Sequence, residues 1–244
     1  MEKVVHLLWG DPAAGDELRD RLLSDTAPRL LAAAGVHALT VNVHDRTAAE
    51  APSPAPPPDG EAPHVGQISV FVDSYQRATS VEDTVADLGL RSASYLVSES
   101  LYDDYGTTPH APARDWVDGA RSPGVLTVAL IHRPEGLAYR EWIERWHGTQ
   151  SPVSAELQPR TRYVRNEVVR ALTDGAPEVH GIVEEGWPSA RHVADPYLFF
   201  NAPPGDRAAL DANVGRMMAS VNSCLDLARL RSTTMSEYLV RSVR

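Results

Sequence analysis

The order of strand-like and helix-like segments constrains the fold of this chain of 244 residues more than any other feature. Apolar residues that alternate with polar ones predict strands, and leucines or alanines at helical spacing predict helices. The first half predicts strand, helix, strand, strand, helix and strand, over residues 4–9, 15–34, 36–43, 65–72, 80–90 and 92–101. Pro28 falls within the first helix and is expected to kink or interrupt it.

The second half repeats this order. It predicts a strand, a helix and two strands, then a pair of helical segments and a last strand, over residues 125–132, 138–157, 162–172, 179–185, 189–200, 206–227 and 233–240. A unit of this order makes an antiparallel sheet with its helices on one face, so the other face needs cover. We therefore expect an α+β protein with two tandem ferredoxin-like (βαββαβ) halves, whose antiparallel sheets cover each other around a central pocket.

Composition marks the boundaries of these halves. We expect them at residues 1–105 and 123–244, joined by a linker over 106–122 that mixes glycine, proline and charge without a period. Residues 51–63 hold six prolines, so they are expected to form an extended, solvated loop that neither pairs in a sheet nor builds a helix.

Charge and hydropathy restrict the class of partner. The chain is 43% hydrophobic and 23% charged, which is typical of a globular protein with a real core. Its net charge of −10 argues against nucleic acid and against an anionic membrane as partners, because both need clustered lysine and arginine. The expected partner is a hydrophobic small molecule, and pairing of two such chains into a homodimer stays open.

The single cysteine, Cys224, excludes an intrachain disulfide and a cysteine-based metal cluster. It lies in a helical pattern, where a small buried side chain is the simplest interpretation. The apolar run before Gly10 is too short for a signal peptide or a membrane span. A cytoplasmic protein is expected.

The segment YREWIERWHGTQSPVSAELQPRTRYVRNEVVR, residues 139–170, resembles the EthD-like branch of the dimeric α+β barrel superfamily. In that family an aromatic-rich helix is followed by a histidine, a nearby proline and a strand with Tyr-Val and Asn. The matching residues here are Tyr139, Trp142, Trp146, His147, Pro152, Tyr163, Val164 and Asn166. The resemblance covers residues 125–240 and implies that the sheets pack as an intramolecular dimeric α+β barrel.

This sequence departs from the family pattern in two places. The spacing from His147 to Pro152 is longer than is usual in the family, so the local helix end is expected to differ. The corresponding helix of the first half, DELRDRLLSDTAPRL, has no aromatic residue and no histidine. The first half is therefore expected to be a scaffold, with the pocket between the sheet and helices of the second half.

The candidate catalytic residues are His147, Tyr163 and Glu185. A histidine near neutrality can move a proton at physiological pH, which suits enolisation, dehydration or cyclisation, although a helix-terminal histidine can also simply bind the last carbonyls. Strand alternation places Tyr163, Arg165 and Glu167 on one face, which we expect to look into the space between the sheets. An Arg-Glu pair there can equally be structural.

Aromatic residues and one arginine complete the candidate site. The substrate-binding candidates are Trp142, Trp146, Arg165 and Trp187, and the side chains of Phe199, Phe200, Met217 and Met218 are either pocket walls or plain core. One of Glu184 and Glu185 must point inward, where a carboxyl beside Trp187 would have a raised pKa.

No cofactor is expected. A Gly-rich dinucleotide loop, a P-loop, GxSxG and HExxH are all absent from the sequence. His132, His147 and His180 match no short metal-ligand spacing, so no metal is expected either.

The resemblance and the candidate residues favour a cofactor-independent enzyme that uses acid/base chemistry on a hydrophobic carbonyl- or phenol-bearing metabolite. The reaction would be cyclisation, dehydration, isomerisation or oxidation of a polyketide-like or aromatic intermediate. Two alternatives stay open: a non-catalytic binding protein for a hydrophobic small molecule, and a haem protein with His147 or His132 as axial ligand.

Overall fold

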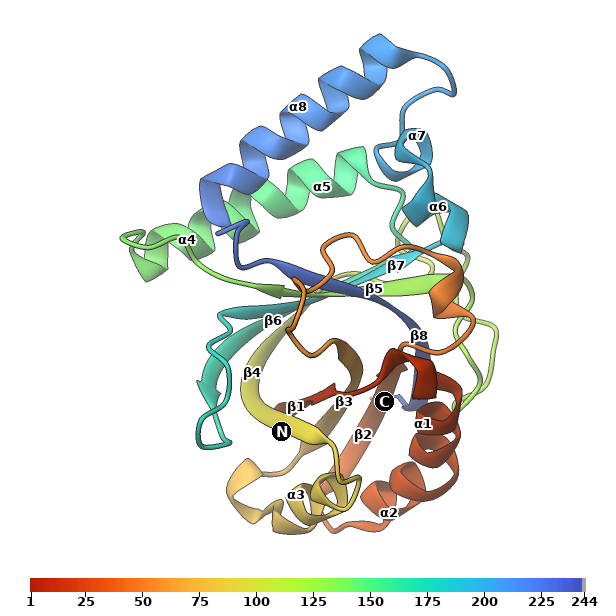
Figure 1. Cartoon of the computed structure of the whole chain (residues 1–244), viewed down its shortest axis with the longest axis vertical. Coiled ribbons are helices and arrows are strands. Elements are labelled where there is room, and N and C mark those ends of the chain that lie inside the picture. Colours follow the sequence, from red (N-terminus) through yellow and green to blue (C-terminus); the bar gives the residue numbers. More distant parts are fainter. Residues whose placement is uncertain (243–244) are drawn as a thin grey trace.

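A computed structural model describes residues 1–242 and shows a mixed α/β fold around a closed, eight-stranded antiparallel barrel (Figure 1). The strands are β1 Glu2–Trp9, β2 Val36–Val43, β3 His64–Val72, β4 Arg91–Asp103, β5 Val125–Ile131, β6 Arg162–Ala171, β7 Gly181–Trp187 and β8 Arg231–Arg241. The helices are α1 Gly15–Arg21, α2 Ala27–Ala32, α3 Thr79–Ala86, α4 Tyr139–Arg145, α5 Ser151–Leu157, α6 Ala190–Ala194, α7 Pro196–Phe199 and α8 Arg207–Cys224. None of the helices in the described part is long and apolar enough to span a membrane.

The strands follow each other around the barrel in the order β1-β3-β2-β8-β5-β7-β6-β4. The first half contributes β4-β1-β3-β2 and the second half β8-β5-β7-β6, so the same arrangement occurs twice. The halves also join edge to edge, through β2 with β8 and through β4 with β6. These two junctions pair the outer strands of each sheet and so close the barrel.

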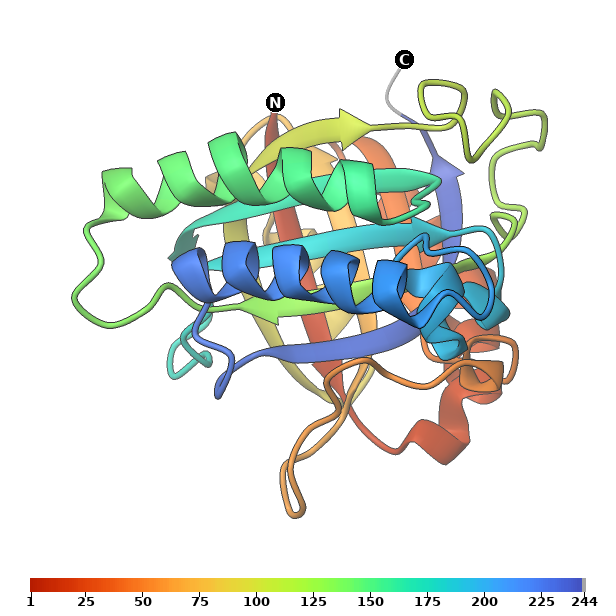
Figure 2. The ribbon, with the colours of Figure 1, turned by 90° about the horizontal axis from the view of Figure 1, so that it is seen from above.

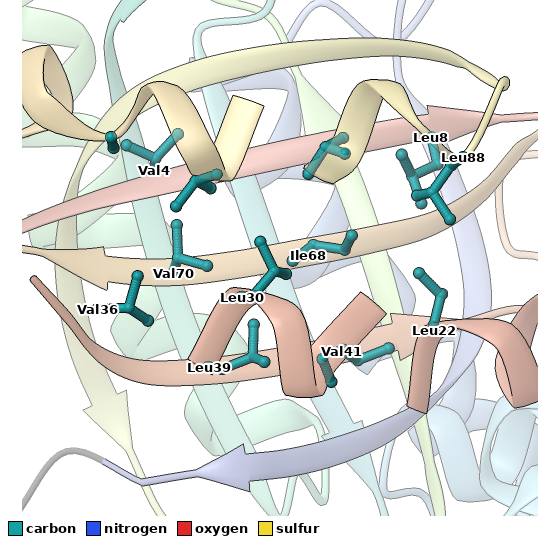
Figure 3. Close-up of a cluster of buried hydrophobic side chains, with 14 of the residues drawn as sticks. Val4, Leu8, Leu22, Leu30, Val36, Leu39, Val41, Ile68, Val70 and Leu88 are labelled. Atoms are coloured by element: carbon teal, nitrogen blue, oxygen red, sulfur yellow. The ribbon is translucent and has the colours of Figure 1, made fainter. Parts of the chain in front are cut away.

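Helices cover the barrel on opposite sides. Figure 1 shows α1, α2 and α3 against the first half and α4, α5 and α8 against the second, and Figure 2 shows α5 and α8 running side by side over the sheet of the second half. In the first half the space between helices and sheet is filled by aliphatic side chains, seen in Figure 3, including Leu22, Leu30, Leu39, Ile68 and Val70.

A wide turn of helix precedes a proline in each half. A π-helical turn, Leu22–Thr26, joins α1 to α2 before Pro28, and a second one, Trp146–Gln150, joins α4 to α5 before Pro152. Proline lacks an amide N–H and clashes with the carbonyl four residues earlier, and the wider turn accommodates both effects. The helix is therefore locally widened at Pro28 instead of broken.

The barrel interior is packed with side chains at one end and keeps a hollow between the two sheets at the other. One end is apolar, with Leu7, Tyr95, Val128, Ile182 and Met235 in a single cluster. The other end is polar and holds a hollow of ≈ 280 Å³ at that mouth, beside residues such as Lys3 and Glu184. The side chains of both sheets interdigitate because the barrel is narrow.

Lys3, the one lysine of the chain, lies at the centre of a buried polar cluster in this end of the barrel. Its Nζ donates to Glu99 Oε2 at 2.6 Å, to Asn166 Oδ1 at 2.8 Å and to Glu184 Oε1 at 3.4 Å. Burial alone would raise the pKa of Glu184, but Lys3 and Arg162 outweigh it and hold that pKa below its usual range. Glu184 therefore points into the barrel as a carboxylate, not as the raised-pKa acid expected beside Trp187.

The proline-rich loop pairs with the barrel, which corrects the expectation that it is only solvated. Strand β2 pairs with β8 from Ser236 onward, so the preceding residues of β8 lack a neighbour on that side. The loop supplies one: Ser232 N donates to Ala55 O at 2.7 Å, and Thr234 Oγ1 donates to Pro52 O at 2.8 Å. Carbonyl groups of the loop accept these bonds, including that of Pro52, whose own nitrogen cannot donate.

A buried histidine makes stability depend on pH. His64 is 4% exposed, and burial lowers its pKa to about 4. The unfolded chain, with a histidine pKa near 6.5, takes up the proton first, so the stability from neutral His64 is complete above pH 6.5 and falls as the pH drops toward 4. We expect His64→Leu to remove about 2 kcal/mol from the loss of unfolding free energy between pH 7 and pH 5.

Urea unfolding at both pH values measures this loss. The matched control is His37→Leu, because His37 lies exposed on β2. Equal losses in wild type and His64→Leu would contradict the expectation.

Candidate functional site

A cavity of ≈ 430 Å³ lies between the sheet of the second half and the helices that cover it. Its size is in the range of small-molecule sites. Most of its walls are apolar, and the residues that line it include Ala129, Ile131, Trp146, Val183, Phe199, Phe200, Met217, Met218 and Val221. Pro54 of the proline-rich loop lines its edge. The cavity lies where the sequence placed the pocket of the second half, on the helix side of the sheet.

The aromatic wall depends on a glycine in the sheet. The rings of Trp142 and Trp146 are stacked with centroids 4.9 Å apart, and both are buried. A Cβ at Gly181 would lie 2.7 Å from Trp146 Cη2, so only glycine lets this ring lie against the strand. Trp146 borders the cavity, and Trp142 supports it from behind.

The first half has no such aromatic pair. Counting back from Pro28 and Pro152, Leu22 and Leu23 occupy the places of Trp146 and His147. Leu22 belongs to the packed core seen in Figure 3. The aromatic wall of the cavity is therefore made by residues that only the second half of the sequence contains.

Tyr163 and Glu185 lie side by side on the floor of the cavity. They are directly opposite partners in the register of β6 and β7, so their side chains project from the same face of the sheet. Both border the cavity. Burial raises the pKa of Tyr163, so at neutral pH this side chain is a protonated phenol that can donate a hydrogen bond.

Arg160 connects these two side chains and was missed by the sequence analysis. Its Nη1 donates to Glu185 Oε1 at 3.0 Å, and its guanidinium lies 3.7 Å from the centroid of the Tyr163 ring. Arg160 is 2% exposed although it belongs to the short segment between α5 and β6. No local pattern marks an arginine in a turn as buried, so only the tertiary structure reveals it.

The strand β6 faces the opposite way to the expectation. Tyr163 packs with Trp146 on the helix side, and Arg165 Nη1 donates to Ser151 Oγ of α5 at 2.9 Å. Asn166 instead points into the barrel, where it contacts Lys3. The expectation assumed that the apolar face of the strand meets the helices, but the barrel interior is apolar at one end and takes that face instead.

His147 lies beside the pocket instead of in its wall. Its ring packs edge-on against Trp146 with centroids 4.6 Å apart, and it does not border the cavity. Burial, with a smaller contribution from the charge of Arg165, lowers the pKa of His147 to about 4. At neutral pH the imidazole is therefore uncharged.

Two other substrate-binding candidates, Trp187 and Arg165, lie behind the walls of the cavity. Trp187 is fully buried, donates from Nε1 to Thr127 Oγ1 at 3.0 Å and stacks on Phe199 at 4.5 Å. Arg165 also donates to Ser100 Oγ at 3.0 Å and so links β6 to β4. The structure thus brings Trp146, Tyr163 and Glu185 to the cavity, with Trp142, Trp187 and Arg165 holding its walls.

Metal-binding side chains do not converge within residues 1–242, where no group of at least three His, Cys, Asp or Glu could hold an ion. His132 and His180 have ring centroids 6.0 Å apart, and His132 Nε2 lies 2.6 Å from the carbonyl oxygen of Glu178. Burial raises the pKa of the Cys224 thiol to about 11, so it is not an activated nucleophile.

Known structures share this architecture. An anthrone oxidase-like protein matches 100% of this chain and 94% of its own length, with 16% identity and a TM-score of 0.55. This chain shares the fold of that protein. At this identity the likeness concerns the fold alone.

Two further matches are a candidate monooxygenase from Lactobacillus acidophilus and a chlorite dismutase-like protein, each with 10% identity and a TM-score of 0.46. They cover 98% and 100% of this chain and 96% of their own lengths. No protein-family model and no curated protein sequence matches the chain.

Proposed function

We propose that this protein is a cofactor-independent enzyme that transfers protons on a planar, hydrophobic, carbonyl- or phenol-bearing metabolite. The observation that carries the proposal is the pairing of Tyr163 and Glu185 on the floor of an otherwise apolar cavity of ≈ 430 Å³. A phenol that donates beside a carboxylate that accepts is a suitable pair for enolising a carbonyl compound.

The roles follow from the chemistry of each group. Tyr163 donates a hydrogen bond to the carbonyl oxygen, where negative charge develops as the adjacent C–H bond ionises. Glu185 takes the proton, and Arg160 holds its carboxylate at 3.0 Å. Trp146 and the other aromatic walls bind the flat face of the ligand and exclude water. Enolisation is the first step common to cyclisation, dehydration, isomerisation and oxidation.

Anthrone is a suitable probe, because it is a flat ketone with an acidic methylene and because one structural neighbour is named anthrone oxidase-like. In air the enolate would react with oxygen, and one anthrone plus one O₂ gives one anthraquinone plus one water. We expect the protein to accelerate exchange of the methylene protons in D₂O without oxygen, followed by NMR, and to accelerate anthraquinone formation in air.

The rival function, a binding protein, gives a different result in the same experiment. Anthrone that binds, seen as quenching of tryptophan fluorescence, but exchanges no faster than in buffer would favour binding alone. Haem titration separates the third alternative, because a Soret band of a bound haem would replace the proposal. Native mass spectrometry of the purified protein would show any retained ligand.

The same proposal includes the finer assignment of fold and organisation. We propose that residues 1–105 and 123–244 are two ferredoxin-like halves of one EthD-like protein, because each half has the same strand order and each places a π-helical turn before a proline. Location in the cytoplasm and pairing of two chains belong to this proposal as expectations. Analytical ultracentrifugation of the purified protein measures whether two chains pair.

A further inference from the structure

The proline-rich loop, residues 51–63, belongs to the first half but borders the cavity of the second half. It lies between β2 and β3, and Figures 1 and 2 show it in orange beside β8. Its residue Pro54 lines the cavity together with Ser232 of β8. The first half, expected to serve as a scaffold, therefore also supplies part of the cavity wall.

The loop is fixed at its ends and loosely held between them. Ala51 and His64 are each 4% exposed, whereas no residue from 52 to 63 is buried. At the second end, Gly10 N donates to Pro63 O at 3.2 Å. Segments with few buried contacts open locally at a lower free energy than a packed core does. The middle of the loop can therefore open while its ends stay in place.

Three hydrogen bonds hold the middle of the loop against β8. Ser232 N donates to Ala55 O at 2.7 Å, and Thr234 N donates to Ser53 Oγ at 3.3 Å. Thr234 Oγ1 donates to Pro52 O at 2.8 Å. The loop accepts all three bonds and donates none of them. This attachment is weaker than the continuous ladder that joins β8 to β5 on its other side.

An ion pair completes the attachment. Arg231 donates from Nη2 to Glu61 Oε2 at 3.0 Å and from Nε to Glu61 Oε1 at 3.1 Å. The two side chains are 24% and 41% exposed, and ion pairs in contact with water contribute little to stability. The pair can therefore break and form again at low cost.

We infer that the proline-rich loop is the entry gate of the cavity: its middle leaves β8 to admit the ligand and pairs with β8 again to close the mouth. This inference rests on the proposed function, because it concerns the same cavity. Closure excludes water from Tyr163 and Glu185, where the proton is transferred.

The competing entry is the connection between α8 and β8, residues 225–230. Three of its leucines, Leu225, Leu227 and Leu230, also line the cavity. It is tied to the barrel by Asp226 N, which donates to His132 O at 2.9 Å. The experiments must therefore distinguish these two segments.

A reversible cross-link tests the gate. Ala55 and Ser232 face each other in an antiparallel bridge, where Cα atoms lie about 4.5–5.5 Å apart, a separation that suits a disulfide. In oxidised Ala55→Cys/Ser232→Cys protein, anthraquinone should associate at least about 10-fold more slowly than in the same protein after reduction. Dissociation should slow by a similar factor, so that the dissociation constant changes little. Stopped-flow quenching of tryptophan fluorescence measures both rates, and native Cys224 is fully buried and does not compete.

Glu61→Gln weakens the attachment without a cross-link. It should speed the association of anthraquinone by about 2–5-fold, the effect of losing one exposed ion pair. The matched control is Glu178→Gln, because Glu178 is exposed and pairs at 2.8 Å with Arg229 of the connection between α8 and β8. Faster association in Glu178→Gln and not in Glu61→Gln would place the entry at that connection and overturn the inference.

Amide hydrogen exchange of the wild-type protein tests the opening without any ligand. The Ser232 amide donates to the loop, whereas alternation along the strand turns the Thr233 amide toward β5. We expect the Ser232 amide to exchange at least about 100-fold faster than the Thr233 amide, as followed by NMR.

The outcomes separate the gate from the proposed function. Equal exchange of the two amides, or equal association rates of the oxidised and reduced double variant, would overturn the inference and leave the proposed function intact. Failure of anthraquinone to bind the wild-type protein would instead count against the proposed function, while amide exchange would still decide whether the loop opens.

Discussion

Replacing Glu185 by glutamine is expected to lower the rate of proton exchange on anthrone by about 10²–10⁴-fold, the usual contribution of a positioned general base. The amide has nearly the same shape as the carboxylate, and its oxygen can still accept from Arg160, which lies at 3.0 Å in wild type. Binding of the ketone should change little by comparison, because Tyr163 and the aromatic walls remain. The measurement is the NMR exchange rate at saturating ligand, beside the dissociation constant from fluorescence.

Glu156→Gln is the matched control, because Glu156 is exposed and pairs with Arg216 on the outside of the helices. It should exchange protons at the wild-type rate. If Glu185→Gln kept the wild-type rate while Tyr163→Phe also did, the proposed acid/base pair would be wrong. Loss of activity in His147→Ala alone would point instead to the histidine as base.

Replacing Lys3 by methionine is expected to lower the free energy of unfolding by about 3–5 kcal/mol, the cost of breaking a buried ion pair by removal of one partner. Lys3 is 5% exposed and donates to Glu99, Asn166 and Glu184. Its removal leaves Glu184, which is 1% exposed, with Arg162 as its remaining cation. Urea denaturation at pH 7 measures the change.

A second substitution tests the electrostatic cause. Glu184→Gln in the Lys3→Met background removes the buried charge that lost its lysine partner and should restore at least half of the lost stability. Two losses that simply add would show that Lys3 acts through packing alone. Because the cluster lies inside the barrel, anthrone binding on the other face of the sheet should persist in folded Lys3→Met protein.

Local patterns were sufficient for most of the elements. Alternation and helical spacing predict strands close to β1 through β8 and a helix close to α8, because those signals depend on residues near in sequence. They also predict the repeated order from which the closed barrel follows. The effect of Pro28 was only half predicted, since the sequence indicates a disturbance but not that a π-helical turn absorbs it.

The aromatic part of the site was visible in the sequence. The cluster of Trp142, Trp146 and His147 has no counterpart in the first half, and a cavity bordered by Trp146 lies in the second half. The direction of β6 was not visible, because both of its faces are buried and the alternation of Tyr163 and Val164 gives no absolute orientation. Which face of β6 turns to the helices depends on the side chains it meets, those of the helices on one side and those of the barrel interior on the other.

The amino-acid sequence by itself determined the elements, their doubled order and the half that carries the aromatic residues, since these depend on neighbours along the chain. The tertiary structure decided which side chains meet. It places Arg160 against both Tyr163 and Glu185, and Lys3 against Glu184. Those contacts join residues from separate strands and turns, and burial and charge pairing act on distance in space, which no local pattern contains.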